Sequence, residues 1–506
     1  METNMSNSGI SRGLTAKRSY RRFIAGLATV VVCAFALSSC LNDFLEPEPL
    51  NLITHENYWK SESDARAALN AAYAHMQQAY KVGFIFWTEA RSDDFIGSST
   101  GAYPYQSVCY NNLSSSYPCC NWNNWYKMVS VANYGIHFIP GMTGKLSEEK
   151  QRHLLSEAYF LRAYAYFNMM RIWGDVPLIT EPTLTKSDVT KPSRTPMAKV
   201  EEQIIRDIDS AAVNVDEGVE ELYRYSAGAL YALATDVAMW THDYLRALDF
   251  SKRLMDLQRY SLDIADFTKI CNPANTSDNI WTMAWNYSAN GDNTILINYN
   301  NSANLVIPTK RIYEKWTDWE TMAGCVDLRR LATIDSMRIS GYGPKHCQRH
   351  PTQMVRSWKW SPGEFLVQTD YREMPIPLYR YADILLLRAE ACNQLGDMVE
   401  AVDLLNTVRR RAGLPDRSVA EFADTEQLED ALLQERQFEL FAEGKRWFDL
   451  MRTGRAMTVM NEHFDGYVKA YAGSGYTMFT EDWQLFWPVH RDIINENENI
   501  TQTGKY

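Results

Sequence analysis

The sequence has 506 residues, of which 46% are hydrophobic and 22% are charged, a composition typical of a globular protein with one large or two moderate domains. Its net charge of −11 argues against a nucleic-acid or anionic-membrane surface, because such surfaces require clustered Lys and Arg. The 15 Trp and 29 Tyr exceed what a helical scaffold needs for packing, so we expect some of them to face a ligand.

Residues 1–39 are predicted to be an export signal. An uncharged run from Phe23 to Leu37 follows a basic cluster made of Lys17, Arg18, Arg21 and Arg22. This run reaches only about 22 Å as a helix, which is short of a hydrocarbon core about 30 Å thick. It ends in Leu37-Ser38-Ser39-Cys40, which resembles a bacterial lipobox, so Cys40 is expected to carry a lipid and to begin the mature chain. The alternative is a plain secretory signal that happens to end near a cysteine.

Seven cysteines follow Cys40, namely Cys109, Cys119, Cys120, Cys271, Cys325, Cys347 and Cys392. An odd number leaves at least one thiol free, and Cys392 is the best candidate because it lies on a predicted buried helix face. Cys109 is a candidate to close a loop with Cys119 or Cys120. The cluster His346-Cys347-x-x-His350 is too short for a zinc site, so we expect no metal and no cofactor.

A single domain is predicted over residues 40–506, and its first helical part is expected at 40–220. After an acidic, proline-containing tether, the alanine-rich stretch from Asp64 to Tyr80 predicts a helix. Apolar spacings predict another from Leu154 to Arg171, with tyrosines all round it, so this helix should be buried on most sides. Gly174 should end it, and Pro177 should block its continuation.

Segments rich in Ser, Asn, Gly, Tyr and Trp occur at Ser92–Tyr126 and Asp278–Trp319, the second within a predicted loop-rich insert at 261–375. Such composition suits carbohydrate, because aromatic rings stack on sugar rings while polar side chains bind hydroxyls. The best candidates for ligand binding are Asp93, Asp94, Tyr103, Tyr105, Trp285, Tyr287, Asn290 and Trp319. Other aromatics in these segments have core spacing: Trp122 and Trp125 lie on a predicted helix, and Trp281 lies in an alternating strand buried on one face.

A helical hairpin is predicted between Ile376 and Pro415, at the start of a C-terminal helical part that covers 376–506. Its first helix has a buried stripe formed by Ala382, Leu385, Leu386, Ala389 and Cys392. Its second helix has a stripe formed by Ala401, Leu404, Leu405 and Val408. The turn Leu395-Gly396-Asp397 makes the helices antiparallel, and Asp397 and Glu400 have the spacing of a capping box.

A second hairpin at 221–260 is found by comparing the chain with itself at an offset of 154 residues. Asp397, Ala401 and Asp403 then fall on Asp243, Ala247 and Asp249. Such pairs resemble tetratricopeptide-type units, so we predict a mainly α fold with a tetratricopeptide-like scaffold and a loop-rich ligand-binding lobe with a few short strands. The alternative is that two unrelated amphipathic hairpins share a few alanines.

Charged and aromatic residues alternate between Leu428 and Arg452. We interpret this stretch as a salt-bridged helix whose charges find partners at three- and four-residue spacings, rather than as a catalytic carboxylate pair.

Several segments together resemble the SusD/RagB family of outer-membrane glycan-binding lipoproteins. They are the lipobox cysteine, "DFLEPEP", "NYWKSESDARAALNAAY", "SEAYFLRAYAYFNMMRIWGDVPLI", "RYADILLLRAEA", "ERQFELFAEGKRWFDLMRTGR" and the C-terminal "LFWPVHRDIINENENITQTGKY". Two departures from the family pattern, at Trp487–His490 and at Gln502–Tyr506, are expected to loosen the terminal turn.

The resemblance implies a non-catalytic, lipid-anchored protein exposed on the cell surface. It would bind an oligosaccharide or polysaccharide and deliver it to a SusC-like, TonB-dependent outer-membrane transporter. Two alternatives differ in class: a surface adhesion or structural lipoprotein, and a glycoside hydrolase. The hydrolase would need two carboxylates across a cleft, and Asp93 with Asp94 is the only tempting pair among the aromatic loops. Neighbouring residues of an extended segment point to opposite faces, so this pair is not expected to flank one bond.

Overall fold

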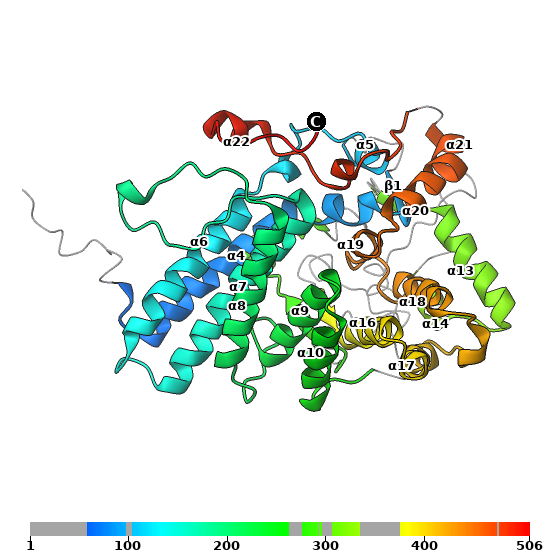
Figure 1. The fold of residues 1–506 in the computed structure, drawn as a ribbon, viewed down its shortest axis with the longest axis horizontal. Coiled ribbons are helices and arrows are strands. Elements are labelled where there is room, and N and C mark those ends of the chain that lie inside the picture. Colours follow the sequence, from blue (N-terminus) through cyan, green and yellow to red (C-terminus); the bar gives the residue numbers. More distant parts are fainter. Residues whose placement is uncertain are drawn as a thin grey trace, which may run out of the picture. The chain divides into compact units, whose positions relative to one another are not determined.

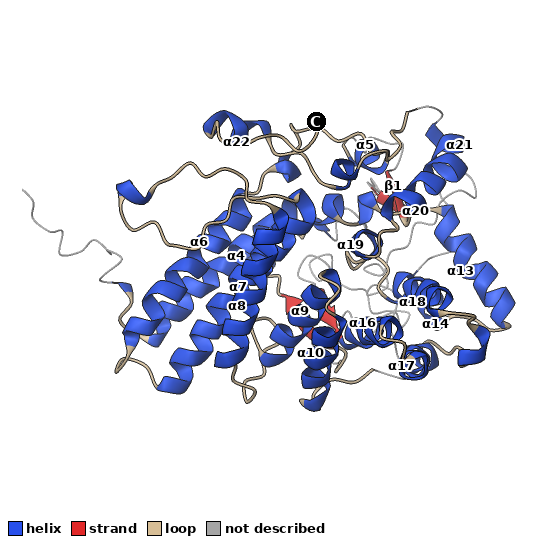
Figure 2. Ribbon diagram, viewed as in Figure 1, coloured by secondary structure: helices blue, strands red, loops and turns tan. Residues whose placement is uncertain are grey.

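The computed structural model describes residues 58–97, 104–262, 276–291, 293–295, 306–333, 375–472 and 475–506. In these ranges the chain is mainly helical with short strands, which confirms the predicted fold class (Figure 2). The export signal and Cys40 lie outside the described residues. Within the described ranges, no helix is both long and apolar enough to cross a membrane.

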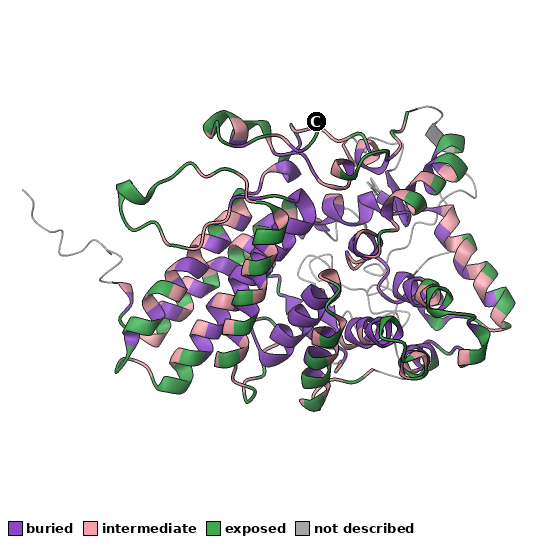
Figure 3. Ribbon diagram, viewed as in Figure 1, coloured by how far each residue is buried: buried purple, intermediate pink, exposed green. Residues whose placement is uncertain are grey.

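Four long helices pack together in the first part of the described chain (Figure 1). They are α4 (Glu62–Trp87), α6 (Asn123–Phe138), α7 (Glu148–Trp173) and α8 (Met197–Asn214). α7 contacts the other three, so most of its residues are buried, as predicted (Figure 3). Gly174 ends it with a φ of 72°, a conformation that glycine adopts without strain, and donates its N–H to the Met170 carbonyl.

α4 is longer than the predicted helix at both ends. It begins after Ser61, whose hydroxyl accepts from the Asp64 N–H while the Asp64 carboxylate accepts from the Ser61 N–H. This reciprocal cap satisfies two backbone donors that a helix start leaves free. The last turns of α4 contain the run Gly83–Trp87, in which every residue but Phe86 is buried.

Both predicted hairpins are present, at the predicted offset. The first consists of α9 (Ala227–Trp240) and α10 (Tyr244–Asp256), and the second of α16 (Tyr381–Gln394) and α17 (Met398–Arg411). α9 and α16 are each 14 residues long, and both of their ends differ by 154 in residue number. α10 packs on α16, which joins the two units.

The second helices of the two hairpins begin with the same type of N-terminal cap. The Asp243 and Asp397 carboxylates each accept a hydrogen bond from the N–H three residues on, at 3.1 Å in both cases. Positive φ occurs at the equivalent residues His242 (57°) and Gly396 (86°). The capping box is only half formed, because the Glu400 carboxylate pairs with Arg388 instead of returning to the Asp397 N–H.

All residues of the predicted stripes of the second hairpin except Ala382 belong to one buried cluster, to which Leu428 and Leu432 of α18 (Thr425–Glu439) also belong. Leu248 and Met255 of α10 pack against the same cluster. Ala247 and Ala401, which match at the offset, are both fully buried, which supports a true structural repeat.

Ala401→Leu is expected to lower the free energy of unfolding by about 1 to 3 kcal/mol, because the added methylenes have no space between packed helices. Urea denaturation of the two proteins measures the change. Val399→Leu is the matched control on the same helix, since Val399 is 70% exposed and its replacement should change stability by less than about 0.5 kcal/mol. Equal stability of Ala401→Leu and the wild type would contradict the close packing.

Two small antiparallel sheets pair strands that are far apart in the sequence. β1 (Phe95–Gly97) pairs with β3 (Val306–Pro308), and β2 (Asn279–Met283) pairs with β4 (Ile376–Arg380). Trp281 is buried in β2 as predicted, but every residue of this strand is buried, not one face alone. Trp122 and Trp125 are buried as well.

The predicted loop-rich insert contains helices in its described part. They are α11 (Tyr287–Asn290), α13 (Lys310–Ala323) and α14 (Leu328–Thr333). The other short α-helices of the described chain are α5 (Tyr105–Cys109), α19 (Arg446–Arg452), α20 (Ala456–His463), α21 (Lys469–Ala472) and α22 (Arg491–Glu496).

The prediction of one salt-bridged helix from Leu428 to Arg452 is wrong in two respects. The stretch is not one helix, because it is interrupted between α18 and α19, where Ala442 and Gly444 have positive φ. Most charged residues of this stretch are buried, and many pair with distant segments, for example Glu439 with Arg380 and Arg446 with Asp93. The interpretation as a structural rather than catalytic stretch agrees with this pairing.

The C-terminal turn is held tightly, contrary to the expectation that its departures would loosen it. The Gln502 amide accepts from the Val489 N–H at 2.7 Å and donates to the Val489 carbonyl at 2.9 Å. Trp487 and Val489 are buried, and the Trp173 indole donates to the Pro488 carbonyl. The replaced residues therefore make their own packing contacts.

The described cysteines are free thiols. Cys109, Cys119 and Cys120 are buried without a disulfide, so the suggested loop closure is not formed. Cys392 is free and buried on its helix, as predicted. Cys271 and Cys347 lie outside the described residues.

Candidate functional site

The C-terminal half of α4 supports both segments that were predicted to bind a ligand. The Gln77 amide donates to the Ala284 carbonyl at 2.8 Å, and the Lys81 ammonium donates to the Asn290 carbonyl at 3.1 Å. Further along α4, Phe86 stacks on Tyr105 with ring centroids 4.3 Å apart and planes 12° apart. Five helical residues advance about 7.5 Å, so the two segments lie against neighbouring turns of one helix.

The β1–β3 pair joins the same two segments a second time. Gly97 lies opposite Val306, so the chain leaves β1 and enters β3 at the same end of the pair. Thr309, just after β3, donates its N–H to the Asp94 carbonyl and its hydroxyl to the Asp93 carbonyl. Tyr103, one of the predicted ligand residues, lies outside the described residues.

Tyr105 is the predicted residue that is best placed to contact a ligand. It begins α5, and both it and Phe86 remain partly exposed, so this aromatic pair has ring surface available for a sugar. Burial, and then the nearby Cys119, raise the pKa of Tyr105 to about 12, so its hydroxyl stays protonated. Gly97 lets α5 approach closely, because a Cβ there would lie 2.5 Å from the Gln106 Cα.

Trp285 and Asn290 make hydrogen bonds inside the second segment. The Trp285 indole is only 6% exposed and donates to the Gly291 carbonyl at 2.9 Å. The Asn290 side chain accepts from the Asn286 N–H at 3.0 Å. These bonds close the turn around α11, so they favour a supporting role for Trp285. The Tyr287 side chain is not among the described ones.

Asp93 and Asp94 are buried immediately before β1, and both carboxylates face the Gln437 side chain. The Gln437 amide donates to Asp93 at 3.3 Å and to Asp94 at 2.6 Å. The expectation of opposite faces is therefore wrong, because these residues form a bend instead of an extended strand. Arg446 also binds the Asp93 carboxylate, at 2.9 Å. Both carboxylates therefore bind groups inside the protein.

The two carboxyls differ in charge state. Although burial opposes it, Arg446 holds the pKa of Asp93 well below its usual range. Burial, and then the charge of Asp93, raise the pKa of Asp94 to about 7. One Asp94 oxygen is buried without a hydrogen-bond partner among the described residues, which is consistent with a protonated carboxyl.

Trp319 lies on α13 and not in an irregular segment. Its ring packs edge-on against Phe438, with centroids 6.3 Å apart, and the Arg409 guanidinium lies 4.9 Å from its centroid. These contacts place Trp319 against α18 and α17.

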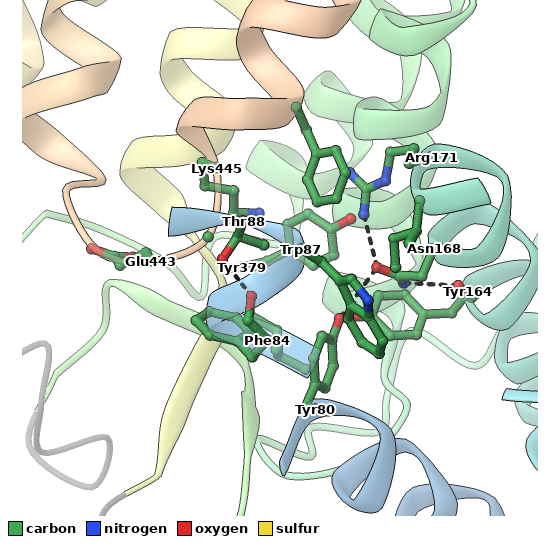
Figure 4. A pocket seen from close by; sticks show the side chains of 14 residues that line it. Tyr80, Phe84, Trp87, Thr88, Tyr164, Asn168, Arg171, Tyr379, Glu443 and Lys445 are labelled. Atoms are coloured by element: carbon green, nitrogen blue, oxygen red, sulfur yellow. Dashed lines mark hydrogen bonds between the residues drawn. The ribbon is translucent and has the colours of Figure 1, made fainter. Parts of the chain in front are cut away.

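A small internal cavity lies where α4, α7, β4 and the loop before α19 meet (Figure 4). Tyr80, Tyr164, Asn168 and Arg171 converge on it, and the Arg171 Nε is buried without a partner among the described atoms. Its volume of about 30 Å³ suits one or two water molecules and no sugar. This cavity is therefore too small to hold a glycan.

Sequence reasoning missed Phe86 and Lys81. Phe86 follows helical apolar spacing in the run "GFIFW", which indicates core. Lys81 has no sequence signal at all, because its partner is a carbonyl 209 residues away.

Two family models match the chain. One is described as the SusD family and covers residues 331–506, and the other is described as starch-binding and associating with the outer membrane and covers residues 43–239. A SusD-like protein of Formosa agariphila is 30% identical, covering 94% of this chain and 98% of its own. A second SusD-like protein of that organism is 25% identical, covering 84% and 90%.

Solved structures share the fold. A SusD homolog from Bacteroides thetaiotaomicron has a TM-score of 0.74 at 20% identity, covering 92% of this chain and 100% of its own. A laminarin-binding SusD-like protein has a TM-score of 0.70 at 22% identity, covering 88% and 100%. At these identities, the likeness concerns the fold alone.

Proposed function

The chain belongs to the SusD family of non-catalytic, glycan-binding proteins associated with the outer membrane, and from this premise we propose that it captures a glycan at the cell surface. In this proposal Cys40 carries a lipid anchor, and the bound glycan passes to a SusC-like, TonB-dependent transporter. The surface that binds is the α4 platform, which we define as Lys81 and Phe86 with Tyr105, Asn286 and Asn290.

The observation that carries the proposal is the meeting of two separate aromatic and polar segments on α4. One brings the Tyr105 ring, stacked on Phe86, and the other brings the exposed Asn286 and the half-buried Asn290. An aromatic ring, amide groups and a cation held by one helix suit a neutral, hydroxylated ligand. Laminarin is the first polysaccharide to test, because a structural neighbour is described as binding it, and starch is the second.

Tyr105→Ala is expected to weaken glycan binding about fivefold or more, because truncating an aromatic anchor commonly costs about 1 kcal/mol or more. A panel of polysaccharides first identifies the ligand, and calorimetry then measures its affinity for the variant. Tyr244→Ala is the matched control, since this half-buried tyrosine lies on α10, away from the platform. Unchanged affinity in Tyr105→Ala would remove the platform from the site. A protein that binds no polysaccharide would favour the adhesion alternative.

Cys40→Ala is expected to give an unacylated protein that leaves the membrane fraction, because the lipobox-like sequence offers the thiol of Cys40 to the lipid. Fractionation and metabolic labelling with palmitate measure both effects. Cys33→Ala, in the same signal, serves as the control and should still be acylated. Retention of the Cys40 variant in the membrane would contradict the lipid anchor.

A further inference from the structure

A second hollow lies on the helical layer, separate from the α4 platform. It has a volume of about 480 Å³ and lies between α6, α7, α8 and the chain at 180–182. In Figure 1 these helices run side by side, and α7 contacts both of the others. Its size falls in the range of pockets that hold small organic ligands.

The segment 179–183 forms a fixed rim of this hollow. The Asn133 amide donates to the carbonyls of Ile179 at 3.0 Å and Glu181 at 3.2 Å. The Arg162 guanidinium donates to the Thr180 carbonyl at 2.9 Å, and the Tyr134 hydroxyl donates to the Thr183 carbonyl. Side chains of α6 and α7 thus hold the rim in place without a ligand.

The floor of the hollow is polar and carries no net charge. Arg162 binds Asp207 through two parallel bonds of 2.8 and 2.7 Å and also donates to the Asn133 side-chain oxygen at 2.9 Å. Arg162 and Asp207 are buried, at 5% and 1% exposed, so their charges balance inside the protein. The bonds to Asp207, Asn133 and Thr180 use four of the five N–H groups of Arg162.

The rim presents groups with spare hydrogen-bonding capacity. Tyr159 of α7 is half-buried, with the Arg162 guanidinium 5.8 Å from its ring centroid. Three groups make no hydrogen bond or ion pair to any described residue: the Tyr159 hydroxyl, the Glu181 carboxylate and the His137 ring nitrogens. A tyrosine, a carboxylate and an imidazole therefore surround a polar floor.

These groups select the class of ligand. An apolar molecule would leave the Tyr159 hydroxyl, the Glu181 carboxylate and the His137 ring without hydrogen-bond partners. An anion would meet the Glu181 carboxylate without a free cation among the described residues that line the hollow. A sugar satisfies both conditions, because it brings hydroxyls for Glu181 and His137 and C–H faces for Tyr159. We propose that this hollow, the α6–α8 hollow, is a second binding site for one or two neutral sugar units, an inference that rests on the proposed glycan-binding function.

Two sites on one chain would bind one polysaccharide more tightly than either alone. A long glycan that leaves one site remains near the other, so its effective concentration there is high. Short oligosaccharides that reach a single site should lack this gain.

Hydrogen exchange of the mature protein with laminarihexaose and maltohexaose, each at saturating concentration, tests the proposal. We expect slower exchange at 179–183 in the wild type and in Tyr105→Ala. Tyr159→Ala should lose this protection and weaken calorimetric binding at the hollow about fivefold or more. Tyr159→Phe keeps the ring and should retain most of the affinity, while Tyr244→Ala should behave as the wild type. Thermal unfolding of each variant separates lost binding from lost folding.

The outcomes distinguish the two sites. If Tyr105→Ala loses binding and the segment 179–183 shows no protection, the α6–α8 hollow is not a site and the platform stands. If 179–183 is protected and Tyr105→Ala binds normally, the α6–α8 hollow binds the glycan and the α4 platform does not. If neither hexaose binds, methyl glycosides of glucose, galactose, mannose and xylose are tested at about 50 mM, a concentration that detects sites weaker than millimolar. If none of them protects the segment 179–183 from exchange, the proposal is overturned.

Discussion

Glu439→Ala is expected to lower the free energy of unfolding by about 3 to 5 kcal/mol, because it removes one partner from a buried charge cluster. The Glu439 carboxylate is 1% exposed and binds Arg380 at 2.9 Å, Arg329 at 3.2 Å, and Arg411. Although burial opposes it, Arg411, Arg380 and Arg329 lower the pKa of Glu439 to about 2, so the group is charged at all ordinary pH values. Its loss leaves three buried guanidinium groups short of negative charge.

Chemical denaturation at pH 7 measures this effect, and Glu314→Ala is the matched control. Glu314 pairs with Lys310 on the surface of α13, where both side chains are more than a third exposed. Surface pairs contribute little, so the control should lose less than about 1 kcal/mol. Because the pKa of Glu439 is lower in the folded protein than in the unfolded chain, its contribution is present above about pH 4.5 and is lost as pH falls toward 2. A Glu439→Ala protein as stable as the control would show that the cluster does not depend on this carboxylate.

Asp94→Asn is expected to be more stable than the wild type at pH 7 to 8, by up to a few kcal/mol. The pKa of Asp94 is about 7 in the folded protein and 3.8 ordinarily, so the folded state holds a proton that the unfolded chain releases between these values. Wild-type stability should therefore fall as pH rises from about 4 to about 7. An asparagine side chain resembles the protonated acid, so the Asp94→Asn variant should lack this fall.

Asp93→Asn is the matched comparison and should have the opposite sign. Arg446 keeps Asp93 charged, so its neutralisation leaves a buried guanidinium without its carboxylate and should lower stability at pH 7. Urea denaturation of the three proteins from pH 4 to 8 compares the slopes. Parallel curves for Asp94→Asn and the wild type would show that Asp94 is ionised over the whole range.

The candidate site could be predicted only in part. Composition directed attention to the two segments around Tyr105 and Asn290, because loops rich in aromatic and polar residues have no helical spacing to explain them. It did not distinguish Tyr105, which stays partly exposed, from Trp285, which is buried and hydrogen-bonded to Gly291. The difference depends on α4, whose Gln77 and Lys81 bind the second segment across more than 200 residues of chain.

The sequence by itself determined the features whose causes lie within a few residues. The helical stripes, the Asp243 and Asp397 caps, the turn at Gly396 and the 154-residue repeat all follow from spacing, and the structure contains them. Only the tertiary structure decided where the charged residues of α18 and α19 find their partners. Helical spacing predicts pairs three or four residues apart, but a buried charge is stabilised by whichever opposite charge the fold brings near. Arg446 therefore pairs with Asp93, 353 residues before it in the chain, because burial excludes the water that would otherwise solvate both groups.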